Sequence, residues 1–196
     1  MSSTPRRAHT AGSTEGPAVP RTGAGSLLLL NVVLLGGITA WLTLIAVNNI
    51  TDFDTNRALL EQTITMQTLI EDPLRGNGLE WRALPRGLAA PALVAVIVYQ
   101  LGTVALMWRA VATGVLGLLR PGTALVGFVR QVNYSLIAFV GLFIGFLVTG
   151  LWFGYWLSLG PVQMVHFTLL VIGALVAILT NLLSSAPPGP AQEHLL

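Results

Sequence analysis

Residues 27–50 read LLLLNVVLLGGITAWLTLIAVNNI, an apolar run without a charged side chain. An α-helix needs about 20 predominantly apolar residues to cross the hydrocarbon core of a bilayer, so this run is long enough to span it. It is also longer than the apolar part of a secretory signal peptide, and no small-residue cleavage site follows it. The sequence therefore predicts an uncleaved first membrane span.

Three further apolar stretches lie toward the C-terminus. Residues 87–113 form the second, and residues 131–192 carry no charge at all, which leaves room for two more spans. Residues 158–161 separate these two, because Gly160 favours a turn and Pro161 is suited to begin a helix. The sequence predicts an all-α integral membrane protein with four transmembrane helices, at about residues 27–50, 87–113, 132–157 and 162–183.

The composition excludes several classes of protein. Charged residues make up 9% of the chain and apolar residues 54%, whereas a soluble domain usually carries about 25% charged residues. The lipid bilayer is therefore the expected surrounding. Cysteine is absent, so no disulfide and no thiolate metal site can form. The arginines are scattered beside membrane segments, which argues against a nucleic-acid partner.

The two ends of the chain and the arginines predict the organisation and orientation. Residues 1–25 and 184–196 are poor in large apolar side chains and are expected to be disordered tails around one membrane domain, residues 26–183. An even number of spans places both tails and the middle loop on one side. That side holds more arginines than the other, so both termini are predicted to be cytoplasmic, in a bacterial inner membrane. The two sets are Arg6, Arg7, Arg21, Arg109, Arg120 and Arg130, against Arg57, Arg75, Arg82 and Arg86.

Residues 51–86 then form a periplasmic loop between the first two spans. Apolar residues recur there at roughly helical spacing, which predicts a short amphipathic helix on the outer face. Asp54 or Thr55 is expected to cap its start. Pro73 is expected to end it, and the Gly76-Asn77-Gly78 segment is typical of a turn. The apolar positions are Leu59, Ile64, Met66, Leu69 and Ile70.

This loop also carries a resemblance to a known family. The motifs are Asn48-Asn49-Ile50-Thr51-Asp52-Phe53, Thr55-Asn56, Met66-Gln67-Thr68, Trp81-Arg82 and, later, Leu151-Trp152-Phe153. In these motifs, and over most of residues 27–183, the chain resembles the predicted small integral membrane proteins of domain-of-unknown-function family 2165. The resemblance supports a bacterial four-span protein, and it supplies no catalytic residues because that family has no established activity. Family members tend to carry an acidic residue in the middle of the second span, where this chain has Gln100.

Polar and aromatic side chains gather at the outer ends of the predicted spans. One interpretation is a small polar site open to the periplasm, with Asp52, Arg82 and His166 within reach of one another. The other is helix capping, with Trp152, Tyr155 and Trp156 as an ordinary interface belt. One His and one Asp do not make a metal signature, so no metal site is predicted. The candidate cluster comprises Asn48, Asn49, Thr51, Asp52, Trp81, Arg82, Gln163 and His166.

Two features within the spans point to helix packing. Asn31 and Gln100 are polar, and polar groups are costly in lipid, so both are expected to hydrogen-bond between helices. Small residues recur at short spacing in the third span, which allows two helix backbones to approach closely. Packing within the chain and homodimerisation both fit this second pattern. The small residues are Gly141, Gly145, Thr149, Gly150 and Gly154.

No complete catalytic or cofactor motif occurs in the sequence, so no catalytic residue and no cofactor are predicted. The first functional hypothesis is a non-catalytic scaffold or accessory subunit that binds a membrane-protein partner or a second copy of itself. The second is a small-solute transporter or channel, which Asn31 and Gln100 would serve. The third is a membrane enzyme acting at the outer face through Asp52, Arg82 and His166.

Overall fold

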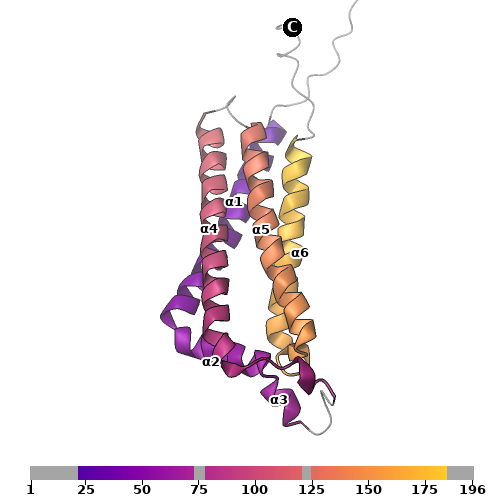
Figure 1. The fold of residues 1–196 in the computed structure, drawn as a ribbon. Helices are drawn as coiled ribbons and strands as arrows, with labels where there is room; N and C mark the ends of the chain where they lie inside the picture. The colour runs from indigo at the N-terminus through magenta and orange to yellow at the C-terminus, as the bar shows by residue number, and fades with distance from the viewer. Residues whose placement is uncertain (1–21, 73–77, 121–124, 185–196) are drawn as a thin grey trace, which may run out of the picture.

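The computed structural model describes residues 22–72, 78–120 and 125–184. Within these ranges the chain forms helices and no strands. Four long helices form a bundle, and α2 and α3 lie across one end of it, which we call the α2 end (Figure 1). The elements are α1 (Thr22–Thr51), α2 (Phe53–Ile64), α3 (Gln67–Ile70), η1 (Glu80–Arg82), η2 (Arg86–Leu88), α4 (Ala89–Leu119), α5 (Leu125–Trp152), η3 (Tyr155–Leu157) and α6 (Gly160–Ser184).

The four long helices, α1, α4, α5 and α6, are each long and apolar enough to cross a membrane. The predicted number of spans and the all-α class are confirmed. Large apolar side chains cover the outside of the bundle; Val98, Val126 and Ile137 are 65%, 83% and 68% exposed. A contiguous apolar surface of this kind is unstable in water and matches the hydrocarbon of a bilayer. The chain is therefore a multi-pass integral membrane protein.

The helix boundaries differ from the predicted ones. Helix α1 begins at Thr22 rather than Leu27, and α4 continues to Leu119 rather than ending at residue 113. Both helices extend beyond the hydrocarbon core of the bilayer, so their ends do not coincide with the ends of the apolar runs. Helix α5 occupies Leu125–Trp152 rather than residues 132–157. It ends early because Gly154 takes a left-handed conformation, with φ of 62°, which does not continue a helix.

The segment between α1 and α4 also departs from the sequence prediction. Helix α2 begins at Phe53 with Asp52 at the N-cap position, so the predicted cap at Asp54 or Thr55 is wrong. Met66 has a φ of 53°, and this left-handed residue divides the expected single amphipathic helix into α2 and α3. Pro73, Gly76 and Asn77 lie outside the described residues, as do residues 1–21 and 185–196 of the predicted tails.

One apolar cluster, which we call the main core, fills the bundle between the four long helices. Gly114 shows how tightly it packs, because a Cβ on Gly114 would lie 2.5 Å from Val32 Cγ2 and 2.6 Å from Phe128 Cε2. Only glycine lets α1, α4 and α5 approach this closely. The buried members are Val32, Leu35, Ile38, Leu42, Val104, Met107, Ala110, Phe128, Val129, Val132, Leu136, Phe139, Leu142, Phe143, Leu169, Val176 and Leu183.

Side-chain hydrogen bonds join all four pairs of neighbouring long helices. Asn49 Nδ2 donates to Gln100 Oε1 at 2.9 Å between α1 and α4, and Thr180 Oγ1 donates to Asn31 Oδ1 at 2.8 Å between α6 and α1. The expectation that Asn31 and Gln100 bond between helices is thereby confirmed. The others are Trp108 to Thr43 (α4–α1), Tyr99 to the Ala138 carbonyl and Thr113 to Gln131 (both α4–α5), and a reciprocal pair between Asn133 and Asn181 (α5–α6).

Candidate functional site

A second, smaller apolar cluster, the end core, holds α2 and α3 against the bundle. It consists of Ile64, Met66, Leu69, Ala89 and Phe153. Polar contacts reinforce the attachment: the Leu84 amide donates to the Ile64 carbonyl at 2.8 Å, and Arg86 Nε lies 2.7 Å from Glu61 Oε1. Helix α2 is therefore fixed to the start of α4.

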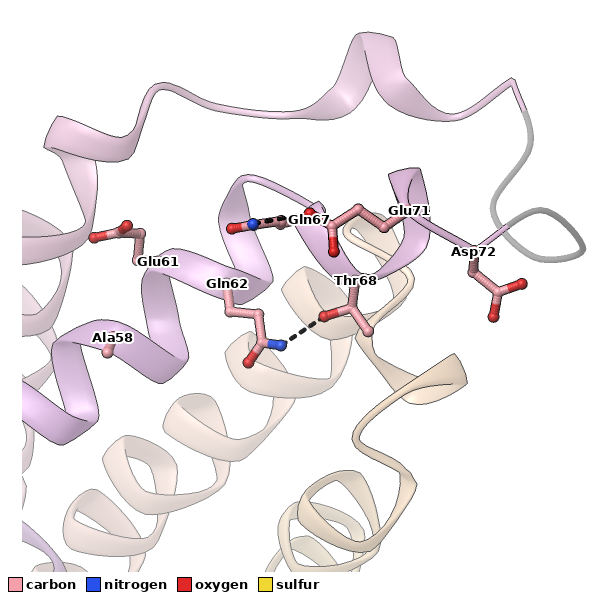
Figure 2. Close-up of a pocket in the computed structure, with 7 residues that line it drawn as sticks. All are labelled: Ala58, Glu61, Gln62, Gln67, Thr68, Glu71 and Asp72. Atoms are coloured by element: carbon pink, nitrogen blue, oxygen red, sulfur yellow. Dashed lines mark hydrogen bonds between the residues drawn. The ribbon is translucent and has the colours of Figure 1, made fainter.

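A wide polar groove of about 650 Å³ lies along α2 and α3 (Figure 2). Its side chains pair with one another: Gln62 Nε2 donates to Thr68 Oγ1 at 2.7 Å and Gln67 Nε2 to Glu71 Oε1 at 2.9 Å. No group of three or more His, Cys, Asp or Glu side chains in the described parts of the chain could hold a metal ion. The groove has the character of a hydrated surface. Its lining is Ala58, Glu61, Gln62, Gln67, Thr68, Glu71 and Asp72.

A second space, which we call the apolar cavity, has a different character. It measures about 220 Å³, is partly open, and lies between α2, the last turns of α5 and the first turns of α6. It is therefore bordered by two membrane spans and covered by the amphipathic helix. Its lining is Asn56, Leu59, Leu60, Thr63, Phe146, Thr149, Gly150, Tyr155, Leu159, Val162 and His166.

The polar members of this lining bond mostly to their own helices. Thr63 Oγ1 donates to the Leu59 carbonyl at 2.9 Å, and Thr149 Oγ1 donates to the Gly145 carbonyl at 2.8 Å. Asn56 Nδ2 donates to the Asp52 carbonyl at 2.8 Å. These bonds use the hydroxyl donors but leave oxygen acceptors free, and apolar side chains make up most of the lining, so the cavity is largely apolar.

His166 is the exception in the wall of the apolar cavity. Its ring stacks on Phe146, with centroids 4.7 Å apart, and its Nδ1 lies 2.8 Å from the Tyr155 hydroxyl. The Tyr155 ring fits there because Gly150 has no side chain; a Cβ at this position would overlap the ring. Burial raises the pKa of Tyr155 above its ordinary 10.0, so the phenol stays protonated at neutral pH.

Arg82 takes part in a separate aromatic arrangement. Its guanidinium lies 5.2 Å from the centroid of the Trp81 ring and 5.1 Å from that of Trp152, and the two rings meet edge to face. Arg82 Nη1 also donates to the Trp152 carbonyl at 3.3 Å. Trp152 is the last residue of α5, where the helix dipole favours a positive charge. Arg82 thus caps α5.

Most residues of the predicted polar cluster have partners of their own. Asn49 bonds to Gln100, the Asn48 carbonyl accepts from Asn56, and Thr51 Oγ1 donates to the Val47 carbonyl. Gln163 Oε1 is buried without a hydrogen-bond partner. Asp52 is exposed and, within the described ranges, its carboxylate forms no ion pair. Asp52, Arg82 and His166 are therefore not bonded to one another.

The partner that sequence reasoning missed is Tyr155, which it assigned to an interface belt. Tyr155 and His166 lie on either side of the turn at residues 158–161, so two antiparallel helices bring them to a similar depth. The positions of these two residues on either side of the turn are the sequence signal from which the pair could have been predicted. Which way each ring faces depends on the conformation of Gly154.

The small residues of α5 also separate into different roles. Gly150 accommodates the Tyr155 ring, and Gly154 makes the left-handed turn. A Cβ on Gly141 would lie 3.1 Å from the Tyr99 hydroxyl of α4, which is tighter than most Cβ contacts in proteins. A Cβ on Gly145 would meet nothing within 4 Å. Among the residues that the structure describes, Gly145 therefore has no close packing against another helix.

Comparison with known proteins bears on the whole membrane domain. No curated protein and no solved structure matches the chain. A family model described as predicted small integral membrane protein matches residues 27–183, a range that includes the core of all four spans and the segment that carries α2 and α3. The resemblance noted from the sequence is confirmed. The chain belongs to the family of predicted small integral membrane proteins designated DUF2165.

Proposed function

We propose that this protein is a non-catalytic scaffold or accessory subunit of a bacterial inner membrane, with its N- and C-termini in the cytoplasm. The observation that carries the proposal is the set of hydrogen bonds that joins every pair of neighbouring long helices. Polar groups within the spans are used to hold the bundle together. Such a bundle is suited to present a fixed surface to a membrane-protein partner or to a second copy of the chain.

The alternative of a transporter has less support from these contacts. A carrier that works by alternating access must move one part of its bundle against another. Such a movement would break hydrogen bonds in lipid. These include the bond between Asn49 and Gln100 and the bond between Thr180 and Asn31. Hydrogen bonds between membrane helices contribute about 0.6 kcal/mol each on average, and they act on all four sides of the bundle.

The alternative of an enzyme depended on Asp52, Arg82 and His166 acting together. Arg82 bonds to the end of α5, and His166 bonds to Tyr155. Asp52 is an exposed N-cap residue. Arg82 and His166 thus have separate hydrogen-bond partners, which gives the enzyme alternative less support.

Distances between spin labels across the bundle test this proposal. The sequence contains no cysteine, so labels attach only at engineered sites. One pair, Leu88→Cys with Val162→Cys, reports on the α2 end, and a second, Leu119→Cys with Leu182→Cys, reports on the opposite end; all four side chains are exposed. In proteoliposomes each pair should give one narrow distance, with or without a proton gradient or a membrane potential.

In a transporter each label pair would give two distances. A gradient would then open one end of the bundle while it closes the other, and this result would overturn the proposal. Cross-linking in native membranes supplies the second measurement. A scaffold should cross-link at a stoichiometric ratio to one membrane protein or to a second copy of itself. If no cross-linked product forms, the scaffold role is rejected.

The orientation has its own test. The α2 end carries the acidic residues of residues 51–86, and the opposite end carries Arg109, Arg120 and Arg130. Reporter fusions near Asn77 should be active in the periplasm, and fusions near Pro121 and after Pro190 should be active in the cytoplasm. A periplasmic C-terminus would contradict the proposed orientation.

A further inference from the structure

We propose that the apolar cavity binds one acyl chain of a bilayer phospholipid, and that His166 Nε2 donates a hydrogen bond to the ester carbonyl of that chain. The ligand would enter from the membrane at the rim between α2 and α6, and α2 would cover it on the water side. The cavity and its lining belong to no role assigned so far, and the site is independent of the scaffold role.

The depth of the cavity matches the position of a lipid ester. Helix α6 has 25 residues, which gives it a length of about 37 Å, against about 30 Å for the hydrocarbon core. His166 follows the first residue of α6, Gly160, by six positions, or about 9 Å. Phe146 precedes the last residue of α5, Trp152, by the same interval. Both lining residues therefore lie just inside the boundary between headgroups and hydrocarbon.

The size and chemistry of the cavity suit a hydrocarbon chain. An engineered apolar cavity of about 150 Å³ stays dry and binds benzene, so a cavity of about 220 Å³ accommodates a longer hydrocarbon segment. Thr63 and Thr149 direct their hydroxyls to their own helix backbones. Water needs two or more polar partners to occupy a site, and this lining offers few.

His166 supplies a single polar contact, as a lipid ester requires. The buried Tyr155 phenol keeps its proton and can donate it to His166 Nδ1. In the tautomer that accepts this bond at Nδ1, a neutral imidazole carries its hydrogen on Nε2. Nε2 forms no hydrogen bond with any residue in the described ranges. A carbonyl oxygen accepts such a bond, and a hydrocarbon chain without an ester cannot.

The rim of the cavity explains how the chain would enter. Leu59 on α2 and Val162 on α6 both line the cavity and are 47% and 43% exposed. An aliphatic chain between them would cover apolar surface on both helices. Val165, on the same helix and 44% exposed, does not line the cavity. A bulky substitution at Val162 should block the site, and the same substitution at Val165 serves as the matched control.

Photolabelling of the full chain tests the proposal. The protein is reconstituted in vesicles of phosphatidylethanolamine and phosphatidylglycerol with a trace of phosphatidylcholine that carries a diazirine on one acyl chain. After irradiation, labelled peptides are identified by mass spectrometry. The α2 peptide that contains Leu59 and Thr63 should be labelled, although α2 is not a membrane span. Val162→Trp should lower this labelling several-fold, and Val165→Trp should leave it unchanged.

Equal labelling of α2 in wild type and Val162→Trp, or equal loss in both tryptophan variants, would overturn the proposal. Melting followed by circular dichroism establishes that the variants are folded. Competition identifies the source of the chain. If unlabelled palmitic acid displaces the probe at lower concentration than unlabelled phospholipid does, the ligand is a free fatty acid and the phospholipid assignment is wrong.

His166→Phe tests the ester contact separately, because phenylalanine can retain the stacking on Phe146 and lacks the donor. Lipid retained after a detergent wash should fall roughly twofold to tenfold, as expected for one hydrogen bond. Unchanged retention would rule out the contact with His166.

Discussion

The two ends of the bundle are constructed in different ways. Toward the end opposite α2, Val32, Gly114 and Phe128 approach so closely that no Cβ fits on the glycine. At the α2 end, α5 and α6 leave an apolar cavity of about 220 Å³, and the short segments α2, α3 and η3 close the bundle. The first region is close-packed and the second contains space.

This difference follows from what holds helices together in lipid. Because lipid tails are as apolar as leucine, burial gives no driving force, and helices associate through close packing and hydrogen bonds. The main core meets that demand with glycine and paired amides. The α2 end lies near the water boundary, where the end core can add the hydrophobic effect. It can therefore leave space between its helices.

Gly114→Leu should have the largest effect, because the new side chain has no space between α1 and α5. We expect a loss of about 3 kcal/mol in the free energy of unfolding, at the upper end of overpacking costs. Thermal melting in mild detergent measures it. A variant that melts like the wild type would show that the bundle is loosely packed at this end as well.

Gly150→Ala should cost less, about 1–3 kcal/mol, because its Cβ displaces only the Tyr155 ring. The Tyr155–His166 hydrogen bond should be lost with it. In a Tyr155→Ala background the same substitution should cost little, since no ring remains to be displaced. If the cost is the same in both backgrounds, the clash with Tyr155 is not its cause.

The Asn49–Gln100 bond should contribute about 0.6 kcal/mol, and at most about 1.7 kcal/mol. A double-mutant cycle with Asn49→Ala and Gln100→Ala isolates this coupling energy from the loss of packing. We expect the double variant to be more stable than the sum of the single losses predicts. Strict additivity would mean that the two amides do not interact in detergent.

Alkaline pH should weaken the α2 end through Tyr155. The folded pKa is raised above 10.0, so the folded chain keeps a proton that the unfolded chain releases. This contribution to stability is complete below pH 10 and is lost as pH rises through the folded pKa. The melting temperature should fall less above pH 10 in Tyr155→Phe. Parallel pH curves for both proteins would exclude this origin.

Gly145→Leu should have the smallest effect, within about 0.5 kcal/mol, because a Cβ at this position has no neighbour within 4 Å. The leucine would face lipid, and its helix propensity exceeds that of glycine. It serves as the matched control for Gly114→Leu. A large loss of melting temperature would reveal a contact between copies of the chain at this position.

Part of the site could be anticipated and part could not. Asn31 and Gln100 were expected to bond between helices, since an unpaired amide in lipid is costly. The partner of His166 was missed, because it depends on how Gly154 redirects the chain and on the space that Gly150 leaves. The stacking of Arg82 on Trp81 and Trp152 was also missed, because it depends on the approach of η1 to the end of α5.

The sequence by itself determined the number of spans and the presence of an amphipathic segment between the first two. These follow from local composition, because bilayer thickness sets the length of apolar chain required. The tertiary structure decided the break at Met66, the separate partners of Arg82 and His166, and the cavity between α2, α5 and α6. These depend on the rotation and depth of each helix, which packing against its neighbours sets and a hydropathy pattern does not encode.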